Sequence, residues 1–124
     1  MARFLILDDD EDIGSVVQMI LQLEGHEAVV LTKADDAIAL QRAQPAEVLI
    51  TDIFMPDKDG LETIQQFRRE FPEAKIIAMS GVGDTQRNTY LFSAREVGAA
   101  QVLRKPFEKE ALLAAVRLVL AARP

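Results

Sequence analysis

Residues 49–60 read LITDIFMPDKDG, and this stretch places Asp52 at the end of an apolar run that is typical of a buried strand. Two more carboxylates, Asp57 and Asp59, follow in the next seven residues. Aspartate is uncommon in strands, and an uncompensated charge at the rim of a core costs free energy. Asp52 therefore either ends its strand in water or takes part in chemistry there.

The size and composition of the chain predict one globular domain that spans residues 1–124. The 124 residues are 49% hydrophobic and 27% charged, and none is cysteine. A chain without cysteine has no disulfide, thiolate metal site or cysteine nucleophile, and it suits a reducing cytoplasm. The first apolar run, Phe4–Leu7, stops at Asp8 and is too short for a signal peptide, and no run approaches a membrane span. We therefore expect a cytoplasmic protein with no membrane partner.

The charge of the chain argues against direct binding to nucleic acid. The net charge is −6, from 20 acidic and 14 basic residues, whereas a phosphate backbone attracts basic patches. Five consecutive acids run from Asp8 to Asp12. The stretch Asp10–Asp12 fits the start of a helix, where negative charge is favourable. That explanation does not cover Asp8 and Asp9, which come directly after an apolar run.

The hydrophobic pattern alternates between strands and helices five times. The predicted strands are Phe4–Leu7, Ala28–Leu31, Val48–Ile50, Ile76–Met79 and Val102–Leu103. The predicted helices are Ile13–Glu24, Ala34–Ala43, Leu61–Phe71, Gln86–Val97 and Glu108–Ala122. Strands that are apolar on both faces and alternate with helices predict an α/β domain with a parallel sheet and right-handed crossovers.

Polar side chains that can do chemistry stand where four of these strands end. Asp8 and Asp9 follow the first strand, Asp52 the third, Ser80 the fourth and Lys105 the last. Ligands bind outside the carboxyl ends of strands in open parallel sheets. With the strand order 2-1-3-4-5, all of these groups meet at one end of the sheet.

The chemistry of this set indicates phosphoryl transfer. Clustered carboxylates push one another toward protonation unless a cation neutralises them, and oxygen ligands suit Mg²⁺. Lys105 supplies an ammonium and Ser80 a hydroxyl, so metal, ammonium and hydroxyl can together hold the oxygens of a phosphoryl group. Asp52 is then the nucleophile that forms an acyl phosphate.

Four motifs, in order along essentially the whole chain, resemble the response-regulator receiver domain of bacterial two-component signalling. They are FLILDDDEDI (4–13), LITDIFMPDKDG (49–60), IIAMSG (76–81) and VLRKPF (102–107). The resemblance implies a stand-alone receiver with the CheY-like, flavodoxin-like fold, a doubly wound five-stranded parallel sheet of order 2-1-3-4-5. It also implies a phosphoacceptor domain that is not an enzyme acting on other substrates, although it promotes its own phosphorylation and dephosphorylation.

The resemblance also assigns roles to individual residues. Asp52 would be the phosphoacceptor, with Ser80 and Lys105 contacting the phosphate. Asp9, Asp52 and the backbone carbonyl of Phe54 would bind Mg²⁺, or Mn²⁺, directly, and Asp8 would act through water. A cis Lys105–Pro106 bond would direct the lysine. The phosphoryl donor would be a sensor histidine kinase or a phosphotransfer protein.

Two features depart from the family pattern. Val102 stands at the aromatic switch position, and valine has no ring that can swing. The loop Gly81–Thr89 is longer than in the chemotaxis type, and we predict that activation orders this loop after Ser80 closes on the phosphate.

The sequence ends directly after the last predicted helix, so we expect no output domain.

Output must then come from a downstream protein partner or from a homodimer. From Ala111 to Ala122 the last helix is apolar except at Arg117, which is more than one buried stripe needs. Leu113, Leu118 and, in the preceding helix, Phe92 lie off the expected core stripes. We predict a partner surface over the helix Gln86–Val97, the strand Val102–Leu103 and the helix Glu108–Ala122.

Three other functions share parts of this pattern. Haloacid-dehalogenase-like phosphatases, which are Mg²⁺-dependent and form an aspartyl phosphate, need a second aspartate two residues after the nucleophile, where this chain has Phe54. A flavodoxin-like FMN carrier needs hydroxyls and backbone donors after the first strand, where this chain has carboxylates. A phosphorylation-independent scaffold receiver remains an alternative, although the whole acid, hydroxyl and lysine set is present.

Overall fold

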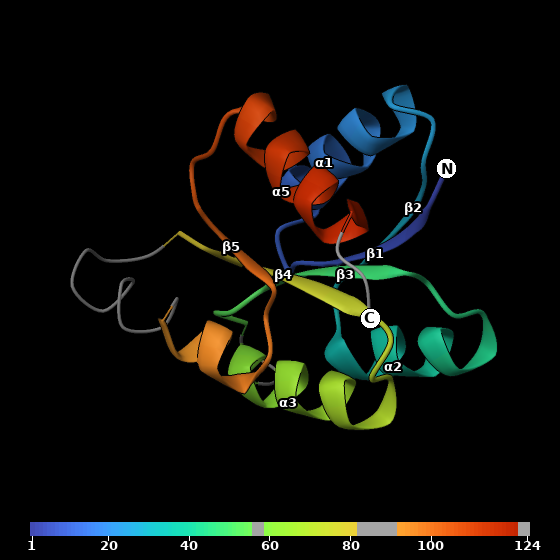
Figure 1. Ribbon diagram of the computed structural model, residues 1–124, viewed down its shortest axis with the longest axis vertical. Coiled ribbons are helices and arrows are strands. Elements are labelled where there is room, and N and C mark those ends of the chain that lie inside the picture. The colour runs from blue at the N-terminus through green and yellow to red at the C-terminus, as the bar shows by residue number, and fades with distance from the viewer. Residues whose placement is uncertain (56–58, 82–91, 122–124) are drawn as a thin grey trace.

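The computed structural model describes residues 1–55, 59–81 and 92–121 and contains one parallel sheet. Its strands are β1 (Arg3–Leu7), β2 (Glu27–Leu31), β3 (Val48–Asp52), β4 (Lys75–Ser80) and β5 (Gln101–Arg104). They lie in the order β2-β1-β3-β4-β5 (Figure 1). The predicted doubly wound α/β fold and its strand order are confirmed. Each strand is one or two residues longer than its apolar run, and β3 continues through Asp52 itself.

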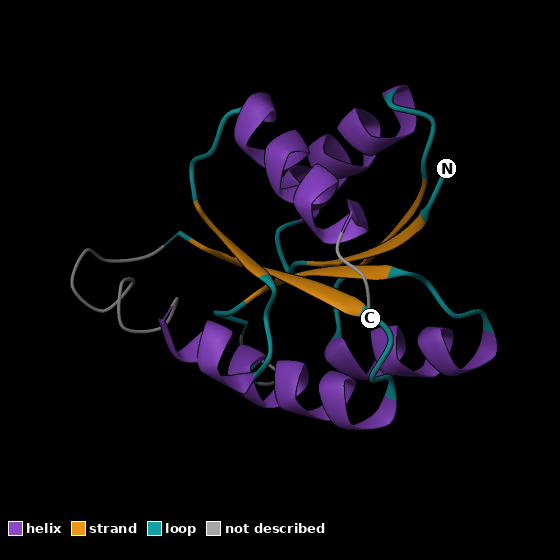
Figure 2. Cartoon of the chain, in the orientation of Figure 1, coloured by secondary structure: helices purple, strands orange, loops and turns teal. Residues whose placement is uncertain are grey.

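Helices cover both faces of this sheet. They are α1 (Glu11–Leu23), α2 (Ala34–Ala43), α3 (Gly60–Glu70) and α5 (Lys109–Ala121). Residues 92–97 are also helical, and the earlier part of the predicted helix Gln86–Val97 lies outside the described residues. One face carries α1 and α5, and the other carries α2, α3 and residues 92–97 (Figures 1 and 2). The result is a three-layer α/β/α domain.

Aspartate side chains cap the N-termini of two helices. The Asp10 side chain accepts hydrogen bonds from the backbone N–H groups of Asp12 and Ile13, which confirms the interpretation of the stretch Asp10–Asp12. Asp59 likewise accepts from the N–H of Leu61 at the start of α3. Both caps satisfy donors that a helix start leaves unpaired.

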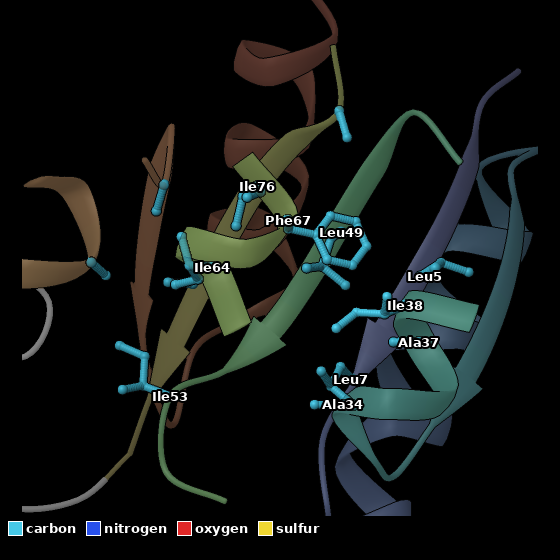
Figure 3. Packing of buried hydrophobic residues seen from close by; sticks show 14 of the residues in the cluster. Leu5, Leu7, Ala34, Ala37, Ile38, Leu49, Ile53, Ile64, Phe67 and Ile76 are labelled. Carbon is cyan, nitrogen blue, oxygen red and sulfur yellow. The ribbon is translucent and has the colours of Figure 1, made fainter. Parts of the chain in front are cut away.

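The apolar runs are explained by a core on each side of the sheet. Successive residues of a strand point to opposite faces. In β1, Phe4 and Ile6 pack toward α1 and α5, whereas Leu5 and Leu7 pack toward α2 and α3. Figure 3 shows the second of these clusters, in which Phe67 of α3 lies against strand residues such as Leu49. Strands buried on both faces must be apolar at nearly every position, so no strand alternates with polar residues.

The last helix buries only one stripe of its apolar surface. Its buried residues are Leu112, Ala115, Val116 and Val119. Leu113 is half-buried and Leu118 is 58% exposed, as expected from their positions off that stripe. No helix in the described part of the chain has the length and apolar character that a bilayer crossing requires.

Candidate functional site

The carboxyl edge of the sheet brings the predicted site residues together. Asp8 follows the last residue of β1, Asp52 ends β3, Ser80 ends β4 and Lys105 follows β5. Strand pairing keeps these ends level, because Leu7 pairs with Thr51, Asp52 with Met79 and Ser80 with Arg104. The site lies where β1 is flanked by β2 and β3, at the switch point of strand order.

Lys105 bridges two of the carboxylates. Its Nζ lies 2.7 Å from Oδ2 of Asp8 and 3.5 Å from Oδ1 of Asp52. The Asp8 side chain is fully buried at 1% exposure, and that of Lys105 is mostly buried at 15%. The second carboxylate oxygen of Asp8 accepts a hydrogen bond from the backbone N–H of Asp10 at 3.0 Å. Both oxygens of Asp8 are therefore engaged within the protein.

Asp52 titrates at an unusually high pH. Burial raises the pKa of its carboxyl group from 3.8 to about 6. The Lys105 ammonium opposes this rise in the pKa, and the Asp8 charge adds to it. The raised pKa means that the ionised form of Asp52 is costly in the folded protein unless further positive charge approaches.

Ser80 places a hydroxyl without a partner at the same edge. The residue is fully buried, and its Oγ has no hydrogen-bond partner among the described residues. A buried hydroxyl without a partner costs free energy, so such a group in a site is poised for a ligand atom. Thr51, the buried hydroxyl on the neighbouring strand, is instead satisfied by the carbonyl oxygen of Asp52 at 3.0 Å.

Three carboxylates are close enough to share a cation. Asp8, Asp9 and Asp52 each offer an oxygen, and these oxygens lie within 4.8 Å of one another. Asp9 is exposed, whereas the other two are buried. A set of hard oxygen donors with an open side fits Mg²⁺ or Mn²⁺, because such ions keep part of their water shell. The chemistry of the donor set therefore fits the predicted metal.

These residues line a cavity of about 680 Å³. Asp8, Asp52, Lys105 and Gly81 are among the residues that line this cavity. Phe54 and Phe107 add apolar surface beside them. A second cavity, of about 670 Å³, is lined by the loops that lead into β3 and β4, and it contains none of the predicted site residues.

Comparison with known proteins places the chain in a family. Residues 4–117 match the response regulator receiver domain model. The chain belongs to this family. Receiver domains are signalling modules of two-component response regulators, so the resemblance drawn from the four motifs is confirmed.

Individual relatives of this receiver domain are response regulators. It is 28% identical over 120 residues to the transcriptional regulatory protein CpxR of Escherichia coli, covering 97% of this chain and 50% of CpxR. It is 33% identical over 111 residues to the nitrogen assimilation regulatory protein NtrX of Azorhizobium caulinodans, covering 88% of this chain and 24% of that protein. The chain therefore spans half or less of the length of these relatives.

Solved structures agree with the fold of the receiver domain. The receiver domain of NtrX from Brucella abortus has a TM-score of 0.89 at 29% identity, covering 97% of this chain and 99% of that one. The beryllofluoride-activated receiver domain of DrrB has a TM-score of 0.85 at 26% identity, covering 98% and 99%.

Several predicted details of the receiver domain can be placed individually. The Lys105–Pro106 peptide bond is cis, as the resemblance implied. Val102 lies on β5, is half-buried and packs against the core on the α2 and α3 side. Asp57 and residues 82–89 of the predicted switch loop lie outside the described residues. Gly81 was not identified from the sequence, because a glycine after a strand has no local signal that separates it from a turn.

Proposed function

We propose that this receiver domain accepts a phosphoryl group on Asp52 from a sensor histidine kinase or a phosphotransfer protein. The observation that carries the proposal is the set of groups around Asp52 at the carboxyl edge of the sheet. These are the Lys105 ammonium at 3.5 Å, the carboxylates of Asp8 and Asp9, and the buried hydroxyl of Ser80, which has no partner in the described part of the chain.

Each residue has a role in this proposal. An oxygen of the Asp52 carboxylate attacks phosphorus, the bond from phosphorus to the donor nitrogen breaks, and an acyl phosphate forms on Asp52. Lys105 stabilises the negative charge on the phosphoryl oxygens, and the hydroxyl of Ser80 donates a hydrogen bond to one of them. The role for Ser80 draws support from its burial without a partner, because the incoming oxygen satisfies it.

The proposal includes a divalent cation. Asp9, Asp52 and the carbonyl oxygen of Phe54 would bind Mg²⁺ or Mn²⁺ directly, and Asp8 would contribute through water. Engagement of both Asp8 oxygens by Lys105 and the Asp10 N–H supports an indirect role for Asp8. The bound cation would neutralise charge on the carboxylates and on the phosphoryl oxygens.

We further propose that the signal leaves through residues 92–97, β5 and α5, toward a downstream protein or a second copy of the chain. Exposed apolar side chains support this surface, with Phe92 66% and Leu118 58% exposed. The net charge of −6 disfavours a direct nucleic-acid partner. Ser80 and Val102 are the proposed switch positions, because they link the site to β4 and β5.

Intact-mass measurement after incubation with acetyl phosphate and Mg²⁺ tests the phosphoacceptor role. The wild type should gain one phosphoryl group, and the gain should disappear with EDTA. Asp52→Asn should gain none, because the amide keeps the shape but is no nucleophile. Asp59→Asn is the matched control and should behave as wild type, since asparagine also caps helices. A phosphoryl adduct of unchanged yield on Asp52→Asn would refute the assignment.

A further inference from the structure

Gly81 lies directly opposite Lys105 at the carboxyl edge of the sheet. The last register pair of β4 and β5 is Ser80 with Arg104, so the next residues of the two segments face each other. A backbone hydrogen bond of 2.8 Å from the Lys105 N–H to the Ser80 carbonyl oxygen fixes this approach. Gly81 and Lys105 both line the cavity that contains Asp8 and Asp52.

The methylene stem of Lys105 lies across the Cα atom of Gly81. A Cβ atom placed on Gly81 would lie 2.9 Å from Cβ, 3.0 Å from Cδ and 3.5 Å from Cγ of Lys105. Carbon atoms in favourable contact are about 3.5–4.0 Å apart. Any side chain at position 81 would therefore displace the stem of the lysine.

The backbone conformation of Gly81 does not require glycine. In the described residues, the glycines with positive φ are Gly25 and Gly98. An L-amino acid can therefore adopt the backbone of Gly81 without strain, and, among the described residues, the close contacts of an alanine there are with Lys105. This separates the effect of the contact from an effect on chain conformation.

The position of the stem determines the position of the ammonium. Along its present path, Lys105 Nζ reaches Asp8 at 2.7 Å and Asp52 at 3.5 Å. We propose that Gly81 is a positioning residue, whose missing side chain seats the Lys105 stem and so holds the ammonium between Asp8 and Asp52. Its effect on phosphoryl transfer rests on the proposed function, whereas its effect on the ammonium rests on the geometry alone.

The first test observes the ammonium itself in the variant Gly81→Ala. The wild type should show a ¹⁵N–¹H signal for the buried, hydrogen-bonded Lys105 ammonium, assigned by its loss in Lys105→Ala. In Gly81→Ala this signal should shift or vanish through faster exchange with water. An unchanged Lys105 signal in a folded Gly81→Ala protein overturns the proposal.

The second test measures the rate of Mg²⁺-dependent phosphorylation by acetyl phosphate. Removing a donor that stabilises transition-state charge costs roughly 10²–10³ in rate, and a displaced ammonium should cost less, about tenfold in Gly81→Ala. The matched comparison is Gly81→Ala in the Lys105→Gly background, which lacks Cβ, Cγ, Cδ and the ammonium. There Gly81→Ala should have no further effect. An equal loss in both backgrounds overturns the proposal.

Two controls keep these outcomes distinct. If the wild type accepts no phosphoryl group, the proposed function fails, and the ammonium signal still decides the positioning role. If Gly81→Ala does not fold, adding Lys105→Gly and Asp8→Asn should let it fold again, because the contacts with Cβ and Cδ are gone and no uncompensated charge remains on residue 8. A triple variant that is equally unfolded contradicts the proposal.

Discussion

Lys105 donates a hydrogen bond of 2.7 Å to Asp8 and lies farther, 3.5 Å, from Asp52. The ammonium therefore compensates the fully buried carboxylate of Asp8 first and leaves Asp52 less neutralised. This unequal sharing supports the proposal that Asp52, rather than Asp8, is the nucleophile.

The first prediction concerns this ion pair. Lys105→Ala should lower the free energy of unfolding by about 3 kcal/mol, because it leaves the buried charge of Asp8 without its partner. The double variant Asp8→Asn/Lys105→Ala should recover most of that loss, since the uncompensated charge is removed. Urea unfolding in EDTA at neutral pH measures both. Equal stability of the single and double variants would show that the pair has no structural role.

A second prediction follows from the raised pKa of Asp52. Burial brings this pKa from 3.8 to about 6, so the folded protein binds the proton more tightly than the unfolded chain. The contribution of Asp52 to stability is therefore greatest below about pH 4 and is lost as the pH rises through about 6. Asp52→Asn should be more stable than wild type by about 2 kcal/mol at pH 7.5, and the difference should shrink toward pH 4.

Urea unfolding without divalent cations at several pH values tests this prediction. Asp59→Asn is the matched control, because Asp59 is exposed and its capping role survives the change. A constant difference between Asp52→Asn and wild type from pH 4 to pH 7.5 would contradict the assigned cause.

The third prediction compares two buried hydroxyls. Ser80→Ala should leave the free energy of unfolding unchanged or raise it by about 1 kcal/mol, because the hydroxyl it removes has no partner among the described residues. Thr51→Val should lower it by about 1 kcal/mol, because the Thr51 hydroxyl bonds the Asp52 carbonyl. Beryllofluoride should bind Ser80→Ala about tenfold more weakly than wild type. Unchanged affinity would mean that Ser80 makes no contact with the phosphoryl group.

A fourth prediction concerns the loop between Asp52 and α3. A Cβ atom on Gly60 would lie 2.4 Å from the Cα and carbonyl oxygen of Ile53, which are backbone atoms that cannot rotate away. Gly60→Ala should therefore lower the free energy of unfolding by at least about 2 kcal/mol. Gly25→Ala is the comparison, because a Cβ there meets nothing within 4 Å and only its φ of +89° is unfavourable, at about 1 kcal/mol. Equal losses in the two variants would exclude the close contact as the cause.

The last prediction tests the proposed output surface. Sedimentation should detect a dimer of the wild type with beryllofluoride and Mg²⁺, and Leu118→Glu should abolish it. Leu23→Glu on α1 is the matched control, since Leu23 is 77% exposed and lies outside the proposed surface. A wild type that is monomeric both with and without beryllofluoride would exclude the homodimer and leave a different protein as the partner. Loss of the dimer in both variants would place the surface elsewhere.

The sequence determined the architecture and the composition of the site. The runs Phe4–Leu7 in β1 and Val48–Ile50 in β3 are apolar at every position, as strands covered on both faces are. In a parallel sheet the carboxyl ends of the strands meet at one edge. Asp8, Asp52, Ser80 and Lys105 stand at or just beyond the ends of apolar runs, so their positions predicted that they lie close together.

Only the tertiary structure decided how these groups share charge and space. The bond from Lys105 to Asp8 joins residues 97 positions apart, and its preference for Asp8 over Asp52 depends on the path of one side chain across Gly81. The Ser80 hydroxyl, which has no partner in residues 1–55, 59–81 and 92–121, and the raised pKa of Asp52 both depend on burial within the folded chain. The role of His26, whose Nδ1 accepts the Ala2 N–H, was equally invisible in the sequence. The periodicity of apolar residues in the sequence indicates which face of a helix or strand is buried. Hydrogen bonding and titration depend instead on distances of a few ångströms, which only the packing of the folded chain sets.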